Sequence, residues 1–111
     1  NDWAVVVAVA DSGGNIVVLH RMDHAQLGSV DIARAKATTV VRFKRTTKVF
    51  EDGLEEGGRQ LRALSMEGVC AVEGGIFLMR NEEIIGAIGV SGVVPTQDAQ
   101  VAAAGAAALA D

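Results

Sequence analysis

The sequence has one cysteine, one proline and no tyrosine, and aromatic residues make up only 4% of its 111 positions. The single cysteine, Cys70, cannot form a disulfide within the chain. This favours a reducing compartment and predicts a cytoplasmic location. No signal peptide is visible at the first residue, and a leader lost before that point would leave the location open.

Long apolar runs are also missing, since no stretch approaches the roughly 18 residues that a membrane span requires. Basic residues are scarce: 10 Lys and Arg stand against 14 Asp and Glu, which gives a formal net charge of −4. Binding a nucleic acid by neutralising its phosphates would need a surplus of clustered Lys and Arg. We therefore expect a soluble protein with neither a membrane span nor a nucleic-acid partner.

One small basic cluster is present, at Arg42, Lys44 and Arg45. Acidic residues follow it directly. They are Glu51, Asp52, Glu55 and Glu56. The ordinary interpretation of such a run is a solvated helix face with ion pairs, and the alternative is an anion site.

The length leaves room for one domain, residues 1–111, with one modest core. Apolar runs bounded by turn residues predict five strands. These span residues 3–10, 16–21, 68–72, 75–79 and 84–90.

Helical patterns occupy three further segments, at 31–43, 47–56 and 97–110. Gly28 and Ser29 precede the first as an N-cap, and Pro95 opens the last. The predicted element order is ββααβββα. Because the strands come in blocks and do not alternate with helices, this order predicts an α+β fold with a mainly antiparallel sheet.

Glycine is abundant: it occupies 13 of the 111 positions, whereas proteins on average have about 7% glycine. Gly86, Gly89 and Gly92 punctuate the last strand segment, "IIGAIGVSG". Glycine weakens a strand unless a bulge or a closely approaching group needs the space. We therefore expect a partner subunit or a ligand to approach the sheet closely there.

A collinear set of motifs resembles the GlcG/HbpS family, which also occurs as the C-terminal domain of PduO-type proteins. Each motif is weak alone, but the ordered set is specific and the resemblance covers residues 4–109. The motifs are "VAVADSGGNIVVLHRMDHA", "IARAKATT", "TKVFEDG", "VEGGI" and "IIGAIGVSGVVPTQDAQVAAAGAAAL".

The resemblance implies a profilin-like fold in which the antiparallel sheet carries helices on both sides. It implies an additional N-terminal helix that this sequence lacks, and assembly into a homo-oligomer, a dimer or larger. It also implies an association with haem, with corrinoid-linked pathways or with bacterial catabolic operons. Haem or a corrinoid is accordingly the implied cofactor.

Two short motifs depart from the family pattern. Where the family commonly has Met-Asp-Gly-Ala, this chain has His24 at the third position. Where the family commonly has Gly-Gly-Ile-Pro, it has Phe77 at the fourth. The first departure adds an imidazole to the predicted pocket, and the second replaces a rigid proline with a bulkier side chain.

A haem site needs an axial ligand, usually His, Met, Cys or Tyr, inside an apolar slot. His24 is the best placed candidate because it lies at a predicted strand-to-helix connection. The remaining candidates are of types that more often fill a core or lie on a surface. They are His20, Met22, Met66, Met79 and Cys70. No His and Cys spacing matches a structural zinc site, so no metal site is predicted.

We predict one ligand pocket lined by Asp23, His24 and Lys36. The alternative for Lys36 is an ion pair with Asp23 that ties the loop to the helix. The full set of predicted ligand-binding residues is Asp23, His24, Lys36, Thr39, Glu73, Gly74, Gly75, Ser91 and Gly92.

Three functions fit this pattern. The first is a small-ligand-binding domain, with haem or a related tetrapyrrole as the ligand implied by the resemblance. The second is a small-molecule isomerase, lyase or hydrolase of a catabolic pathway, with Asp23 or His24 as general acid or base and Lys36 as an electrostatic clamp. The third is an oligomeric scaffold. No nucleophile elbow, phosphate-binding loop or paired-carboxylate motif favours catalysis.

Overall fold

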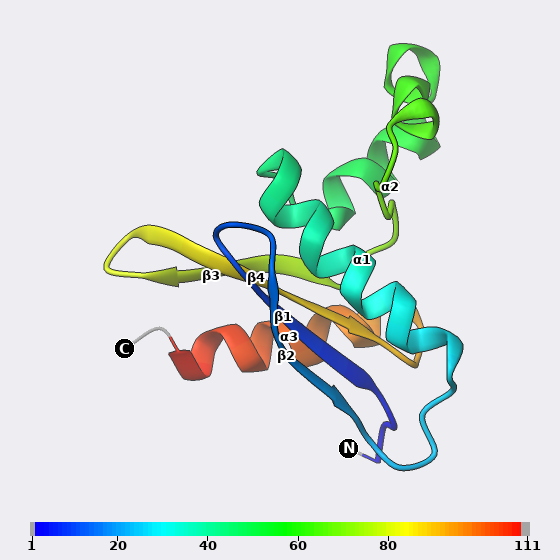
Figure 1. Cartoon of the computed structure of the whole chain (residues 1–111). Helices are drawn as coiled ribbons and strands as arrows, with labels where there is room; N and C mark the ends of the chain where they lie inside the picture. Colours follow the sequence, from blue (N-terminus) through cyan, green and yellow to red (C-terminus); the bar gives the residue numbers. More distant parts are fainter. Residues whose placement is uncertain (1, 110–111) are drawn as a thin grey trace.

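The computed structural model describes residues 2–109, which form one sheet with helices packed on it (Figure 1). The strands are β1 (Val6–Asp11), β2 (Ile16–Arg21), β3 (Gly75–Arg80) and β4 (Glu83–Ser91). The helices are α1 (Gly28–Phe43), α2 (Thr47–Glu56), the 3₁₀ helix η1 (Gly58–Ser65) and α3 (Pro95–Leu109). No helix in the described range is long and apolar enough to cross a bilayer.

The four strands lie in the order β2-β1-β4-β3, and every neighbouring pair is antiparallel. The first and last strands of the chain therefore meet at the centre, where Val6 pairs with Ser91 and Asp11 with Gly86. The expected α+β class and antiparallel sheet are confirmed. The profilin-like assignment stays a prediction.

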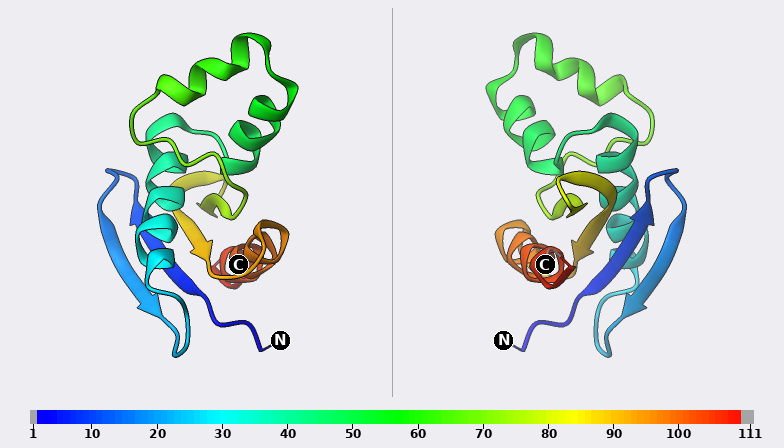
Figure 2. Two further views of the ribbon diagram at one scale, coloured as in Figure 1. Left: turned by 90° about the vertical axis from the view of Figure 1, so that its right-hand side faces the viewer. Right: turned by 90° about the vertical axis from the view of Figure 1, so that its left-hand side faces the viewer.

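Helices α1 and α3 cover opposite faces of the sheet (Figures 1 and 2). Alternate residues of a strand point to opposite faces, so Val6 and Ala8 pack against Ala33 and Ala37 of α1. On the other face, α3 and the sheet form a second cluster. Its buried members are Val5, Leu78, Ile88, Val90 and Ala102.

The strand expected at 68–72 does not form, so the prediction of five strands is wrong and the sheet has four. A side chain of α1 satisfies this backbone instead. The hydroxyl Oγ1 of Thr39 donates to the carbonyl of Gly68 at 3.1 Å and accepts the N–H of Cys70 at 2.9 Å. Gly68 also has φ +84°, which a strand does not accommodate.

The glycines of β4 make room for other parts of the same chain. A Cβ atom at Gly89 would collide with the carbonyl of Ala33 and lie 2.6 Å from the amide nitrogen of Ala37. A Cβ atom at Gly86 would collide with the carbonyl of Ala10. Helix α1 and strand β1 therefore fill the space that we had expected a partner subunit or a ligand to use.

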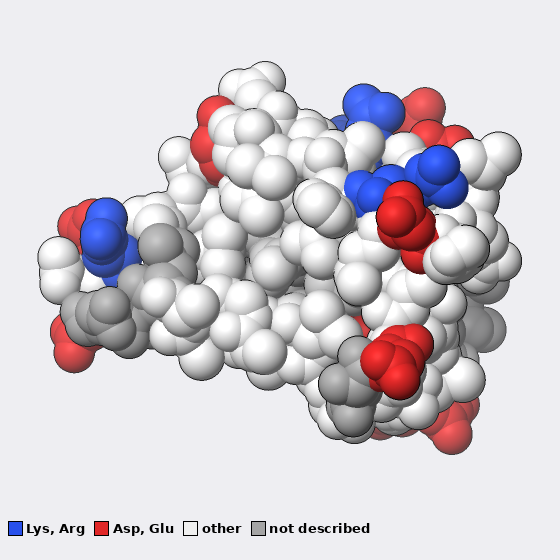
Figure 3. All heavy atoms as spheres, turned by 90° about the horizontal axis from the view of Figure 1, so that it is seen from below, with Lys and Arg blue, Asp and Glu red and all other residues white. Residues whose placement is uncertain are grey.

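The α3 face carries little charge. Seen from below, its middle shows neither Lys, Arg, Asp nor Glu, and the charged side chains gather toward its two ends (Figure 3). On the edge strand β2, Val17 and Val18 are 58% and 52% exposed. The domain therefore has an uncharged region in the middle of the α3 face and, separately, an edge strand with exposed valines.

Candidate functional site

The predicted binding residues fall in two separate places. Asp23 and His24 line a surface cavity at the β2–α1 connection. Lys36, in contrast, is buried in the interior, where α1, β4 and α3 meet.

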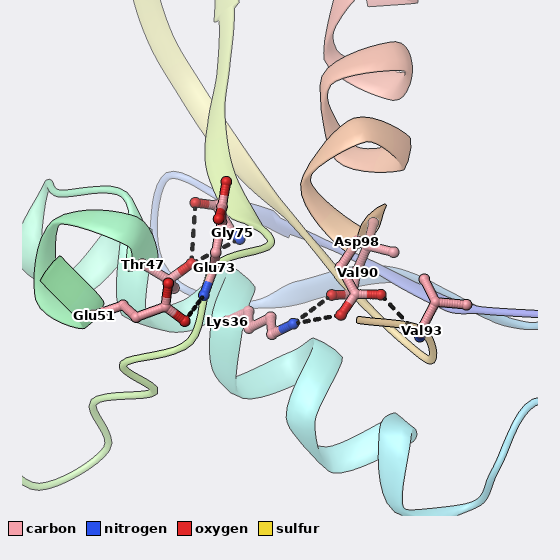
Figure 4. Close-up of polar contacts among 8 residues, drawn as sticks. All are labelled: Lys36, Thr47, Glu51, Glu73, Gly75, Val90, Val93 and Asp98. Atoms are coloured by element: carbon pink, nitrogen blue, oxygen red, sulfur yellow. Dashed lines mark hydrogen bonds and ion pairs between the residues drawn. The ribbon is translucent and has the colours of Figure 1, made fainter. Parts of the chain in front are cut away.

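Lys36 projects from α1 between the end of β4 and the start of α3 (Figure 4). Its Nζ donates to the carbonyl of Val90 at 2.8 Å and to Oδ2 of Asp98 at 3.0 Å. The two side chains are 1% and 3% exposed. The second oxygen of Asp98, Oδ1, accepts the N–H of Val93 at 3.1 Å. The ion pair thus ties three elements together in the interior.

The alternative given for Lys36, an ion pair with Asp23, is wrong because Lys36 pairs with Asp98. An ammonium has three donors, and two of those on Lys36 are already used within the protein. Lys36 lines none of the three cavities described below. Its role in binding a ligand stays a prediction.

Gly74 and Gly75 let the chain pass close to this ion pair. Gly74 has φ +131°, and a Cβ atom there would lie 2.7 Å from Nζ of Lys36 and 2.7 Å from the carbonyl oxygen of Val90. A Cβ atom at Gly75 would lie 2.8 Å from the carbonyl oxygen of Lys36. Both glycines are therefore required by packing, whether or not a ligand binds nearby.

Of two further predicted residues, Ser91 ends β4 and Gly92 follows it. Ser91 is buried, and a Cβ atom at Gly92, where φ is +149°, would lie 2.8 Å from the Cα of Val5. They come close to Lys36 through the neighbouring Val90. The structure thus brings Lys36, Gly74, Ser91 and Gly92 together, but around Asp98 and not around Asp23.

Helix α2 holds the start of β3 through two side chains (Figure 4). Oγ1 of Thr47 accepts the N–H of Gly75 at 2.8 Å, and Oε1 of Glu51 accepts the N–H of Glu73 at 3.2 Å. The residues predicted for the site did not include Thr47, Glu51 or Asp98. For Asp98 a signal existed, because an acidic residue in the first turn of a helix is placed to accept N–H groups.

The second place is an open cavity of about 700 Å³, here called the histidine cavity. It lies where β2 turns toward α1. Its lining residues are Asp2, Trp3, Ala4, His20, Arg21, Met22, Asp23 and His24.

Local backbone geometry sets the shape of the histidine cavity. His24 has φ +71°, a left-handed conformation that histidine adopts more readily than most residues. Nη1 of Arg21 donates to the carbonyl of Ala25 at 3.0 Å and so closes the turn that carries Asp23 and His24. His20 comes from strand β2 itself, so the two imidazoles reach the cavity from a strand and from a loop.

A smaller cavity of about 340 Å³ adjoins the histidine cavity, since both are lined by Trp3 and Met22. Val5 and, from α3, Val101 and Ala104 supply its largely apolar wall. Together the two cavities present imidazole, thioether, indole and aliphatic groups on one surface. Among the described residues there is no group of three or more His, Cys, Asp or Glu side chains that could hold a metal ion by themselves.

Comparison with known proteins gives consistent matches. Residues 1–107 match the family model described as haem degrading protein HbpS-like. Protein GlcG of Escherichia coli K12 is 40% identical over 91 residues, which are 82% of this chain and 66% of GlcG. The chain therefore spans just under two thirds of that relative.

Two solved structures superpose closely. The Klebsiella pneumoniae protein ORFY has a TM-score of 0.90 and 31% identity, over 97% of this chain and 76% of ORFY. A structure of a complex of PduOC with haem has a TM-score of 0.85 and 33% identity, over 96% of this chain and 78% of that one.

The architecture is that of a small antiparallel α+β domain with a helix on each face and adjoining surface cavities beside one end of the sheet. The family model covers nearly the whole chain. The chain belongs to the HbpS-like family, as the sequence motifs indicated.

Proposed function

We propose that this domain binds haem in the histidine cavity. The observation that carries the proposal is the set of side chains on that surface. His20, His24 and Met22 all lie there, and imidazole and thioether groups are the usual protein ligands of haem iron. The solved complex of a relative at 33% identity with haem supports the same ligand.

The surroundings of these donors suit a tetrapyrrole. Trp3 and the adjoining wall from Val5 and Val101 provide apolar contact for a flat ring. Arg21 provides a cation for a propionate, although its Nη1 is also bonded to the carbonyl of Ala25. His20 or His24 would hold the iron, and haem would supply the iron porphyrin on which any redox chemistry depends.

A corrinoid has no comparable support, because the ligand in the solved complex of the relative is haem. The catalytic alternative, an isomerase, lyase or hydrolase, needed Lys36 as a clamp beside Asp23 and His24. Lys36 is instead neutralised by Asp98, away from the histidine cavity. Binding is therefore the function that the described geometry supports best.

Titration with hemin, followed by the Soret band, tests the proposal. We expect saturable binding of hemin. One of the two variants His20→Ala and His24→Ala, the one that removes the iron ligand, should lower the affinity about tenfold or more, because even residues that only contact a metal ligand affect metal affinity to this extent. Met22→Leu tests the thioether that lines the cavity, and Met79→Leu is its matched control. The two methionines are 40% and 37% exposed, and only Met22 lines the cavity. An unchanged affinity in both histidine variants would contradict the proposal.

A homo-oligomer is the second proposal that follows from the sequence. The uncharged middle of the α3 face and the exposed valines of the edge strand β2 support it. The glycines of β4 no longer do, because α1 and β1 occupy the space beside them.

A further inference from the structure

A third cavity, of about 390 Å³, lies between α2 and η1 and shares no lining residue with the histidine cavity. The two helices project from the domain beyond the sheet, and α2 is joined to the start of β3 through Thr47 (Figure 2). Three arginines line this cavity: Arg45, Arg59 and Arg62. We propose that it binds a small organic anion with an apolar body and a carboxylate or sulfonate group. We call it the arginine cavity.

The three guanidinium groups are not neutralised by the protein. Within residues 2–109 the ion pairs within 4.0 Å are Lys36–Asp98 and Lys48–Asp52, and neither involves these arginines. Glu56, at the end of α2, accepts instead from Nε2 of Gln60 at 3.2 Å. A chain of net charge −4 thus gathers three unpaired cations at one cavity.

The side chains of Arg45 and Arg62 are held in place by other contacts. Nε of Arg62 donates to the carbonyl of Arg59 at 3.0 Å. The guanidinium carbon of Arg45 lies 5.5 Å from the ring centre of Phe50, a cation–π contact. Because these contacts leave the other N–H groups of each fork free, the forks remain available to a carboxylate or a sulfonate.

The floor of the arginine cavity is apolar. It consists of Val49 and Phe50 from α2, Ala63 from η1 and Met66 after it. Phe50 is 5% exposed and Ala63 8% exposed, so both belong to the interior, whereas Val49 is 51% exposed. An inorganic anion would use only the arginines, and a neutral apolar molecule only the floor. A molecule with both parts uses the whole site.

Glycines fix the two walls of the arginine cavity. Gly57 and Gly58, with φ of +78° and +62°, turn the chain sharply from α2 into η1. The side chain of Gln60 from η1 lies against Gly53 of α2, where a Cβ atom would collide with its Oε1. At eight residues η1 is long for a 3₁₀ helix. The cavity is therefore built by a specific backbone path.

A pair of fluorescent probes tests the proposal: 1-anilinonaphthalene-8-sulfonate and its neutral analogue N-phenyl-1-naphthylamine. The two share one apolar body and differ by the sulfonate. We expect the sulfonate to bind about tenfold more tightly than the neutral probe. The double variant Arg59→Gln/Arg62→Gln should lose this difference and keep its affinity for the neutral probe.

The control is Arg34→Gln/Arg80→Gln, which removes the same charge from two exposed arginines outside the cavity. It should retain the preference for the sulfonate, and thermal unfolding should show that both double variants are folded. Equal loss in the two double variants, or equal affinity of the two probes for the unaltered chain, would overturn the proposal.

Haem is itself an apolar molecule with carboxylates, so hemin is titrated into the same variants. We expect Arg59→Gln/Arg62→Gln to bind hemin as the unaltered chain does. A loss of hemin binding in that variant would overturn the separation of the two sites. The histidine variants test the haem proposal independently, because His20 and His24 do not line the arginine cavity.

Discussion

Lys36 and Asp98 are 62 residues apart in the sequence, and their charged groups meet at 3.0 Å in the interior of the protein. Removing one member of a buried ion pair leaves an uncompensated charge out of water, which costs far more than the loss of an exposed pair. The ion pair therefore couples the packing of helix α1 to that of helix α3.

Lys36→Met should therefore lower the free energy of unfolding by about 3–5 kcal/mol. Lys48→Met is the matched control, since the pair Lys48–Asp52 has side chains 54% and 50% exposed, and it should change stability little. Chemical denaturation measures both. The double variant Lys36→Met/Asp98→Ala should cost less than the sum of its parts, and additive effects would show that the two charges do not interact.

Gly74→Ala should destabilise the protein by about 2–3 kcal/mol, because it adds a clash to an unfavourable backbone angle. The new Cβ atom would lie 2.7 Å from both Nζ of Lys36 and the carbonyl oxygen of Val90. Gly14→Ala separates the two effects: Gly14 has φ +86° but no atom within 4 Å of a Cβ atom. Gly14→Ala should lower the stability by about 1 kcal/mol. If thermal unfolding gives the same loss for Gly74→Ala and Gly14→Ala, the clash with Lys36 and Val90 contributes nothing.

Thr39→Val should cost about 1–3 kcal/mol, since it removes the acceptor of the Cys70 N–H and the donor to Gly68 while keeping the shape of the side chain. Thr38→Val is the neighbouring control. The hydroxyl of Thr38 bonds only the carbonyls of Arg34 and Ala35 in its own helix, so its loss should matter little. Urea unfolding of the two variants decides whether Thr39 anchors the segment after η1.

Burial raises the pKa of the Cys70 thiol, with Lys36 opposing this shift to a smaller extent. The folded protein should therefore react with iodoacetamide more slowly at about pH 8 than the unfolded chain, because less thiolate is present. The sign for stability follows: above the ordinary thiol pKa the unfolded chain holds fewer protons, so the free energy of unfolding falls as pH rises. Cys70→Ser should remove this decrease of the free energy of unfolding at alkaline pH. If the decrease is the same in Cys70→Ser, another group causes it.

Light scattering should give a mass of at least twice the 11.5 kDa of one chain at micromolar concentration. The exposed Val17 and Val18 of the edge strand β2 are the natural contact, because an open apolar edge invites pairing with a second strand. Val18→Lys should shift the protein toward the monomer. A monomeric mass for the unaltered chain would contradict the proposal.

Local patterns in the sequence were sufficient for most elements. The predicted helix 47–56 coincides with α2, and the strand 16–21 coincides with β2. Turn residues and apolar periodicity act over a few neighbours, so they can be read without knowing the fold. The segment 68–72 has the composition of a strand, but it failed to become one because its backbone groups found a hydroxyl on α1 that lies 31 residues away from Cys70.

The sequence alone determined the α+β class, the antiparallel sheet and the family, and it placed Asp23 and His24 on one loop. Only the tertiary structure decided which charges meet. The sequence offers 14 Asp and Glu residues as partners for Lys36. The pairing with Asp98 depends on how α1 lies against β4 and where α3 begins. Arg59 and Arg62 lie three residues apart on η1, but their position beside Arg45 has the same cause. It depends on the packing of η1 against α2, and side chains brought together by packing leave no local pattern in the sequence.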